Sequence, residues 1–269
     1  MATGQEGGAA RHRLARCVAF IRRLDARCAE RTVPSPYGVA YFCYSLPLVW
    51  GLNALALDDG VRASAAELAD EAERLQGEAG FLHRKVVADS DKLGTRLAGG
   101  FRELGWVVQP LLVMDFAGEG PTVPVAGVRE VDFATLAPVW TEGAGFSMGA
   151  EEAAQVADQR RVTGAAGSAR YFAAYRDERV ASYCELYSDG EIGQIEGVLT
   201  LPEYRGQGLA SAVVTKARLE SEAAGHGLTF LLAEENDWPK ELYRKLGFRT
   251  IGRMWDFLRR PSEAPEAPP

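Results

Sequence analysis

The spacing of apolar residues in the first half of the chain predicts helices that alternate with short strands. Leu14, Val18, Ile21 and Leu24 recur at three- and four-residue steps between arginines, which predicts an amphipathic helix over residues 11–31. Ser64 followed by Glu67 is a capping-box signature, so a second helix is expected to begin there. The other elements predicted here are one or two strands over 38–57, a strand over 85–88, a helix over 96–104 and a strand over 106–116.

The second half has a more regular rhythm of strands and helices. Two β-rich runs, residues 170–176 and 179–187, flank the polar pair Asp177-Glu178, which predicts a hairpin. The other elements predicted are a strand over 123–131, two helices to about residue 162, a strand over 192–201, a helix over 207–224, a strand over 228–233, a helix over 238–246 and a strand pair over 248–258.

A linker of small residues and proline separates the two halves. Residues 117–122 read Ala-Gly-Glu-Gly-Pro-Thr between two apolar stretches, and we place the domain boundary there. The predicted organisation is a flexible start over 1–9, an N-terminal domain over 10–118, a C-terminal domain over 123–260 and a disordered tail over 261–269.

A short internal repeat links the halves. Residues 101–106, Phe-Arg-Glu-Leu-Gly-Trp, match residues 243–248, Tyr-Arg-Lys-Leu-Gly-Phe, and a predicted strand follows each copy. Although six residues can match by chance, the shared context favours two related domains in tandem. The predicted fold class is therefore α+β, with mixed sheets in two similar domains.

Composition narrows the function classes. Apolar residues make up 47% of the 269, charged residues 25%, and no apolar run is long enough to cross a bilayer. With no signal-peptide pattern at the start, we expect a cytoplasmic protein without a membrane partner. The four cysteines form no CxxC pair, so we expect no metal site, and a net charge of −7 disfavours nucleic-acid binding.

The segment Arg205-Gly206-Gln207-Gly208-Leu209-Ala210 carries the clearest chemistry. It lies between a predicted strand and a long amphipathic helix, where two glycines let the backbone approach a ligand and the helix N-terminus favours an anion. The segment lacks the Lys-Ser/Thr of a P-loop, and its glycine spacing differs from that of the dinucleotide fingerprint. A connecting turn is the simpler alternative for a lone Gly-x-Gly.

These residues resemble the GNAT superfamily of acyl-CoA N-acyltransferases. The family signature Arg/Gln-x-x-Gly-x-Gly/Ala, with a proline just upstream, is matched within residues 198–210. A second family feature, a strand, an asparagine and then Tyr-x-x-x-Gly-Phe, is matched by residues 228–233, Asn236 and residues 243–248. The resemblance covers residues 123–260 and implies acetyl-CoA as the cosubstrate.

The resemblance also implies roles for particular residues in cosubstrate binding. The strand that ends near Leu201 would splay from its neighbour and offer its backbone to the pantetheine arm, and the glycine segment would hold the pyrophosphate. Asn236 would hydrogen-bond the pantetheine or acetyl region, although Asn-Asp before a helix is equally an ordinary capping sequence. The implied binding residues are Val198, Leu199, Thr200, Arg205, Gly206, Gln207, Gly208, Leu209, Ala210 and Asn236.

Two residues are candidates for proton transfer. Tyr243 stands where family members often carry a tyrosine facing the sulfur, and a phenol can protonate a leaving thiolate; the alternative is an aromatic residue packed in the core. Glu196 shares the strand face of Val198 and Thr200 and is the candidate base, against a simply solvated carboxylate. Glu185 is a weaker rival.

The sequence thus predicts an acetyl-CoA-dependent N-acetyltransferase in which a small-molecule amine, or an amine of a protein or peptide, attacks the thioester directly. The first half lacks the glycine signature and carries Phe101 where the second half has Tyr243, so it is expected to be a degenerate partner domain or an unrelated α+β cap. The alternative function is a non-catalytic acyl-CoA-binding module. The sequence does not distinguish acetyl from longer acyl groups.

Overall fold

Two long strands, β5 (Val107–Phe116) and β11 (Phe248–Arg259), each belong in part to two structural units of the chain. The computed structural model describes residues 2–144 and 149–261. The larger unit takes in residues 1–28 and 111–252, and the smaller unit takes in residues 29–110 and 253–269. Among the described residues, no helix is long and apolar enough to span a membrane.

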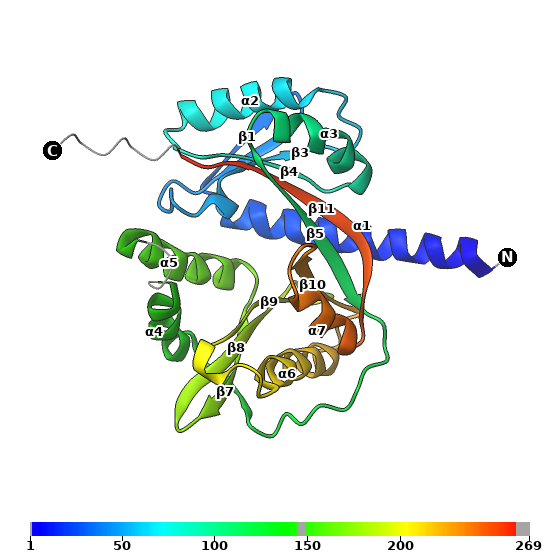
Figure 1. The fold of residues 1–269 in the computed structure, drawn as a ribbon, viewed down its shortest axis with the longest axis vertical. Helices are drawn as coiled ribbons and strands as arrows, with labels where there is room; N and C mark the ends of the chain where they lie inside the picture. The colour runs from blue at the N-terminus through cyan, green and yellow to red at the C-terminus, as the bar shows by residue number, and fades with distance from the viewer. Residues whose placement is uncertain (1, 145–148, 262–269) are drawn as a thin grey trace. The chain divides into compact units, whose positions relative to one another are not determined.

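The larger unit is a mixed sheet with helices on both faces (Figure 1). Its strand order is β5-β10-β9-β8-β7-β6, in which β9 and β10 are parallel and the other neighbours are antiparallel. Besides its parts of β5 and β11, its elements are α1 (Ala2–Cys28), β6 (Val128–Val131), α4 (Phe133–Ala144), α5 (Ala150–Ala166), β7 (Arg170–Arg176), β8 (Arg179–Ser188), β9 (Ile192–Thr200), the 3₁₀ turn η2 (Pro202–Tyr204), α6 (Leu209–Ala223), β10 (Leu228–Glu234) and α7 (Pro239–Lys245).

Strand alternation divides the core of the larger unit into two layers. Phe172 and Cys184 pack with α6, whereas the adjacent Tyr171 and Tyr183 pack with Trp140 of α4. Because successive side chains of a strand point to opposite faces, α6 covers one face of the sheet and α4 covers the other.

The smaller unit repeats part of this arrangement. Its strand order is β1-β2-β3-β4-β11, in which β3 and β4 are parallel and connected through a helix. Its elements are β1 (Arg31–Ser35), β2 (Gly38–Phe42), the 3₁₀ turn η1 (Trp50–Leu52), β3 (Ala54–Leu57), α2 (Ala65–Glu78), β4 (Arg84–Ala88) and α3 (Asp91–Glu103), with its parts of β5 and β11. The predicted mixed-sheet fold in two similar domains is thus confirmed.

Each unit takes one strand from the other half of the sequence. β5 follows α3 of the smaller unit, but residues 111–115 pair antiparallel with β10 of the larger unit. β11 follows α7 of the larger unit, but residues 255–259 pair antiparallel with β4 of the smaller unit. The predicted domains 10–118 and 123–260 therefore do not coincide with the two units, because sequence order does not reveal where a strand pairs.

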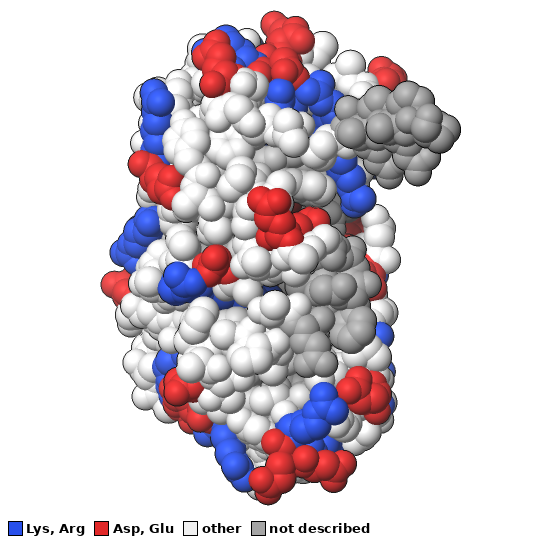
Figure 2. All heavy atoms as spheres, turned by 90° about the vertical axis from the view of Figure 1, so that its left-hand side faces the viewer, with Lys and Arg blue, Asp and Glu red and all other residues white. Residues whose placement is uncertain are grey.

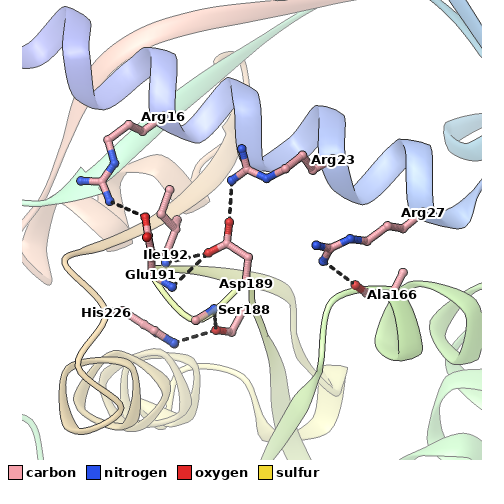
Figure 3. A network of polar contacts seen from close by, with 10 residues as sticks. Arg16, Arg23, Arg27, Ala166, Ser188, Asp189, Glu191, Ile192 and His226 are labelled. Atoms are coloured by element: carbon pink, nitrogen blue, oxygen red, sulfur yellow. Dashed lines mark hydrogen bonds and ion pairs between the residues drawn. The ribbon is translucent and has the colours of Figure 1, made fainter.

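Helix α1 belongs to the larger unit and not to the N-terminal domain in which we expected it. Phe20 is 3% exposed and packs edge-on against Phe230 of β10, with ring centroids 5.7 Å apart. Its basic side meets the turn between β8 and β9, where Arg23 donates to Asp189 at 2.5 Å and Arg16 lies 3.9 Å from Glu191 (Figure 3). The same helix begins at Ala2, so most of the predicted flexible start over 1–9 is helical.

Three further elements differ between the prediction and the structure. β1 was not predicted, because Pro34 and the polar residues around it hide the strand pattern. The predicted strand over 123–131 contracts to β6, and the predicted strand pair over 248–258 is the single strand β11. Of the predicted disordered tail, residues 262–269 lie outside the described residues.

Candidate functional site

A β-bulge in β9 is the central feature of the site. Glu185 of β8 lies opposite Glu196 and Tyr183 lies opposite Leu199, so Gly197 and Val198 together face a single residue, Cys184. Gly197 has a φ of 61°, in the left-handed region that residues with a Cβ rarely adopt. A bulge of this kind bends its strand and interrupts the ladder of hydrogen bonds. It also shifts the alternation of side chains: Val198 packs in the α6 layer, whereas Glu196 lies on the other face with Gln194, so the predicted shared face of Glu196, Val198 and Thr200 is wrong.

The bulge coincides with the point at which β9 leaves its parallel neighbour. β9 pairs with β10 only from Ile192 to Ile195, although β10 continues to Glu234 and pairs there with β5. Beyond the bulge, residues 198–200 line a cavity of about 510 Å³. The divergence that the sequence led us to expect is present, and it leaves the end of β9 facing a cavity instead of another strand.

Most of the predicted binding residues meet around this cavity. Of those residues, the ones on the lining are Val198, Leu199, Thr200, Arg205, Gly206, Gly208, Leu209 and Ala210, with the predicted catalytic Tyr243. Sequence reasoning missed Tyr204, Ser211, Trp238, Pro239 and Leu242 on the same lining. Their places immediately beside the two recognised motifs are a signal that could have found them, because residues next to a ligand-binding turn share its surface.

The glycine segment leaves a helix N-terminus without a side-chain cap. Gly206 and Gly208 both have φ of 76°, and Gly208 is the N-cap residue of α6, which begins at Leu209 and not at residue 207 as predicted. In the part of the chain that the structure describes, no side chain caps this helix N-terminus. Its first N–H groups and the helix dipole are thus directed to whatever occupies the cavity, which suits a phosphate group.

The corresponding helix of the smaller unit is capped by its own side chains. Helix α2 also connects two parallel strands, but Ser64 accepts from the Glu67 N–H at 3.3 Å and the Glu67 carboxylate accepts from the Ser64 N–H at 2.8 Å. This predicted capping box is confirmed. Phe101, the counterpart of Tyr243, is fully buried and stacks on Phe257 with ring centroids 4.3 Å apart. The smaller unit therefore lacks both the anion cradle and the phenol.

Tyr243 and Glu196 occupy electrostatically perturbed positions. Tyr243 on α7 is 7% exposed, and burial, together with the negative charge of Glu196, raises the pKa of its phenol above the ordinary value. Burial likewise raises the pKa of Glu196, while its hydrogen bond from Gln194 at 2.8 Å and the nearby Arg160 act in the opposite direction. The phenol therefore keeps its proton near neutral pH, and the carboxylate becomes a stronger base than usual.

The rival carboxylate, Glu185, is already engaged. It is fully buried, forms an ion pair with Arg160 of α5 and accepts a hydrogen bond from Tyr187 at 2.5 Å. A Cβ placed on Gly197 would lie 2.6 Å from Glu185 Oε1 and 2.7 Å from Arg160 Nη1. The ion pair thus fills the space beside the bulge, which only glycine leaves free.

Two predicted binding residues lie off the cavity lining. Gln207 is exposed, accepts from Arg176 Nε at 3.2 Å and lines a second cavity of about 490 Å³ beside the first. Asn236 is exposed in the turn before α7, and the side chain that bonds to the start of that helix is Asp237, which accepts from the Trp238 N–H at 2.7 Å. Asn236 therefore does not cap α7 in this structure, and its contact with the pantetheine or acetyl region stays a prediction.

The charged side chains on the face drawn in Figure 2 are of both signs. On the face drawn in Figure 2, acidic and basic side chains are interspersed and form no large patch of one sign. Within the described residues, no group of three or more His, Cys, Asp or Glu side chains is arranged to hold a metal ion.

The site's sequence matches a known family model. Residues 167–250 match the model of the acetyltransferase (GNAT) domain, a range that contains the bulge, the glycine segment and Tyr243. The comparison with curated proteins gave no match.

Solved structures resemble the chain over most of its length. A functionally unknown conserved protein from Staphylococcus epidermidis has a TM-score of 0.68 at 15% identity, over 86% of this chain and 93% of that one. A GCN5-related N-acetyltransferase from Kribbella flavida has a TM-score of 0.58 at 18% identity, over 95% and 96%. A tandem GNAT protein from the clavulanic acid biosynthesis pathway has a TM-score of 0.50 at 16% identity, over 78% and 77%. At these identities the likeness concerns the fold.

The bulge yields a direct prediction about Gly197. Gly197→Ala is expected to lower the free energy of unfolding by about 3 kcal/mol or more, because the left-handed backbone costs about 1–2 kcal/mol and the new Cβ disturbs a buried ion pair. Gly225→Ala is the matched control, since Gly225 has a φ of 81° with open space around its Cβ position. Chemical denaturation measures both variants; equal losses would contradict the bracing of the bulge by Arg160 and Glu185.

Proposed function

We propose that the chain transfers an acetyl group from acetyl-CoA to a primary amine, because residues 167–250 match the acetyltransferase (GNAT) domain and the fold resembles that of a tandem GNAT protein. The acceptor is an amine of a small molecule, or of a protein or peptide. The observation that carries the proposal is the cavity of about 510 Å³, which unites the end of β9, an uncapped helix N-terminus and a buried tyrosine.

The cavity offers a distinct environment to each part of acetyl-CoA. The free N–H groups at the start of α6 would hold the pyrophosphate, with Gly206 and Gly208 allowing close approach. The backbone of residues 198–200 would pair with the pantetheine amides as a neighbouring strand does. The thioester would then lie beside the bulge, between Glu196 and Tyr243.

Direct transfer fits the available side chains better than a covalent route. A neutral amine attacks the thioester carbonyl, the C–N bond forms as the C–S bond breaks, and the departing thiolate takes the proton of Tyr243. Glu196 accepts the proton that the ammonium form must lose to become this neutral amine, and the proton that leaves the nitrogen after the attack returns the Tyr243 phenolate to its phenol. Cys184 is fully buried, its sulfur donates to the Val213 carbonyl at 3.3 Å, and burial raises the pKa of its thiol, so it does not supply a nucleophile.

The role of Tyr243 as general acid predicts a loss confined to turnover. Tyr243→Phe is expected to lower kcat by about a hundredfold, because a general acid typically contributes factors of this order, and to leave acetyl-CoA affinity unchanged. Tyr204→Phe is the control, since Tyr204 lines the same cavity. Thiol release and calorimetric binding are measured on each protein.

The same measurements distinguish an enzyme from a non-catalytic acyl-CoA-binding module. Equal turnover by the wild type and Tyr243→Phe would remove Tyr243 from the mechanism. A wild type that binds acetyl-CoA but releases no thiol with a broad panel of amines would instead identify a binding module.

The proposed base predicts a pH-dependent defect. Glu196→Gln is expected to lower kcat most strongly near pH 7 and progressively less at higher pH, where a larger share of the free amine is neutral and no longer needs the base. In the wild type the raised pKa of Glu196 shifts the loss of activity on acidification to a higher pH than an ordinary carboxylate would. Full pH–rate profiles are compared with those of the exposed Glu203→Gln. A defect of the same size at every pH would argue against Glu196 as the base.

A further inference from the structure

A chain of buried polar side chains lies on the face of β8 and β9 opposite α6. Trp140 of α4 lies under the Arg160 guanidinium, whose Cζ is 5.0 Å from the ring centroid. Arg160 forms the ion pair with Glu185, and Glu185 is the register partner of Glu196 on β9. Gln194 completes the chain by donating to Glu196 at 2.8 Å. We call these five residues the acceptor cluster.

The acceptor cluster leaves buried polar atoms without hydrogen-bond partners. Within the described part of the chain, the buried atoms of this cluster without a hydrogen-bond partner are Trp140 Nε1, Arg160 Nε, Gln194 Oε1 and Glu185 Oε1, the last of which lies in the ion pair with Arg160. Trp140 is 2% exposed and Gln194 is 5% exposed. Buried polar groups are almost always satisfied in native proteins, because an unpaired one costs about 1–3 kcal/mol. Apart from the atom in the ion pair, three such atoms in one cluster mark it as a candidate binding site.

The three unpaired atoms outside the ion pair define the chemistry of a ligand that would fit the cluster. Two of them, on Trp140 and Arg160, are N–H donors and require an oxygen acceptor. The third, on Gln194, is an acceptor beside the Glu196 carboxylate, and together they require a group rich in N–H donors. The cluster carries one cationic and two carboxyl side chains, so a cationic group is favoured at the Gln194–Glu196 end. An ammonium a few bonds from a carbonyl or carboxylate oxygen satisfies both ends.

We propose that the acceptor cluster binds an α-amino acyl group, with its ammonium at Gln194 and Glu196 and its carbonyl or carboxylate oxygen at Trp140 and Arg160. This inference rests on the proposed function and names the acceptor class of that reaction. Glu196 immediately precedes the bulge, so an ammonium held there loses its proton next to the place where the thioester would lie. The ring centroid of Trp140 lies 5.6 Å from that of Tyr171 and 6.3 Å from that of Tyr183. The two tyrosine rings would form an aromatic wall for an apolar side chain.

The test compares three amines that share one side chain. Leucine has an ammonium and a carboxylate, leucinamide has an ammonium and a carboxamide, and 3-methylbutylamine has the ammonium without either oxygen group. Thiol release from acetyl-CoA gives kcat/KM for each amine with the wild-type chain and with Trp140→Phe, which keeps an aromatic ring but removes the Nε1–H donor. Trp106→Phe is the matched control, since Trp106 is 4% exposed in the smaller unit.

The expected result is a selective effect of Trp140→Phe. It should lower kcat/KM for leucine or leucinamide about tenfold more than for 3-methylbutylamine, as expected for one buried hydrogen bond. The amine with the larger relative loss tells whether the oxygen belongs to a free carboxylate or to an amide. Because each amine is compared with itself, differences in amine basicity cancel.

Two results would overturn the assignment while leaving the proposed function intact. One is an equal loss for all three amines, which would give Trp140 a structural role. The other is thiol release with polyamines such as spermidine but with none of the three leucine-like amines. If the wild type releases no thiol with any amine, the proposed function itself fails, and this inference fails with it.

Discussion

The bulge at Gly197 is the constraint on which the rest of the site depends. A strand that continued in register beyond Ile195 would have kept β9 and β10 paired, and the space between them would have been closed by backbone hydrogen bonds. The left-handed Gly197 instead places two residues of β9 against Cys184 and bends the strand. The buried pair of Arg160 and Glu185 occupies the room where a side chain at this position would lie. One glycine thereby links the acceptor cluster on one face of the sheet with the cavity on the other.

The two units show that the residues at one helix N-terminus decide whether its N–H groups are free to bind a ligand. Both contain a helix between parallel strands, and both end the next helix with a glycine in the left-handed region, Gly105 in one and Gly247 in the other. In the smaller unit, Ser64 and Glu67 satisfy the first N–H groups of the helix internally. In the larger unit, Gly208 leaves the equivalent donors free. Ligand binding and self-capping are alternative uses of the same backbone groups.

The sequence predicted the parts of this site that arise from local chemistry. The capping box at Ser64 and the hairpin around Asp177 follow from propensities within a few residues. The family motif added Tyr243 to the same cavity. The sequence could not predict the strand exchange of β5 and β11, because which strands pair depends on distant segments.

The features that depend on pairing across strands and between elements were missed for the same reason. Nothing near Gly197 marks it as a bulge, since its conformation follows from its opposition to Cys184. The ion pair of Arg160 and Glu185 joins a helix to a strand across 25 residues and has no local signature. The capping alternative considered for Asn236 was wrong, because the side chain that bonds to the start of α7 is that of Asp237.

The most direct test of the account is calorimetric titration with CoA and acetyl-CoA of the wild type, Ser211→Glu and Ala66→Glu. Ser211 lies in the first turn of α6 and on the cavity lining, so a carboxylate there suits the helix dipole but repels a pyrophosphate. Ala66 is exposed in the first turn of α2 and gives the matched change of charge. The account predicts one site per chain, an affinity reduced about a hundredfold or more by Ser211→Glu and no effect of Ala66→Glu. Absence of binding to the wild type, two sites per chain, or an unchanged affinity in Ser211→Glu would contradict it.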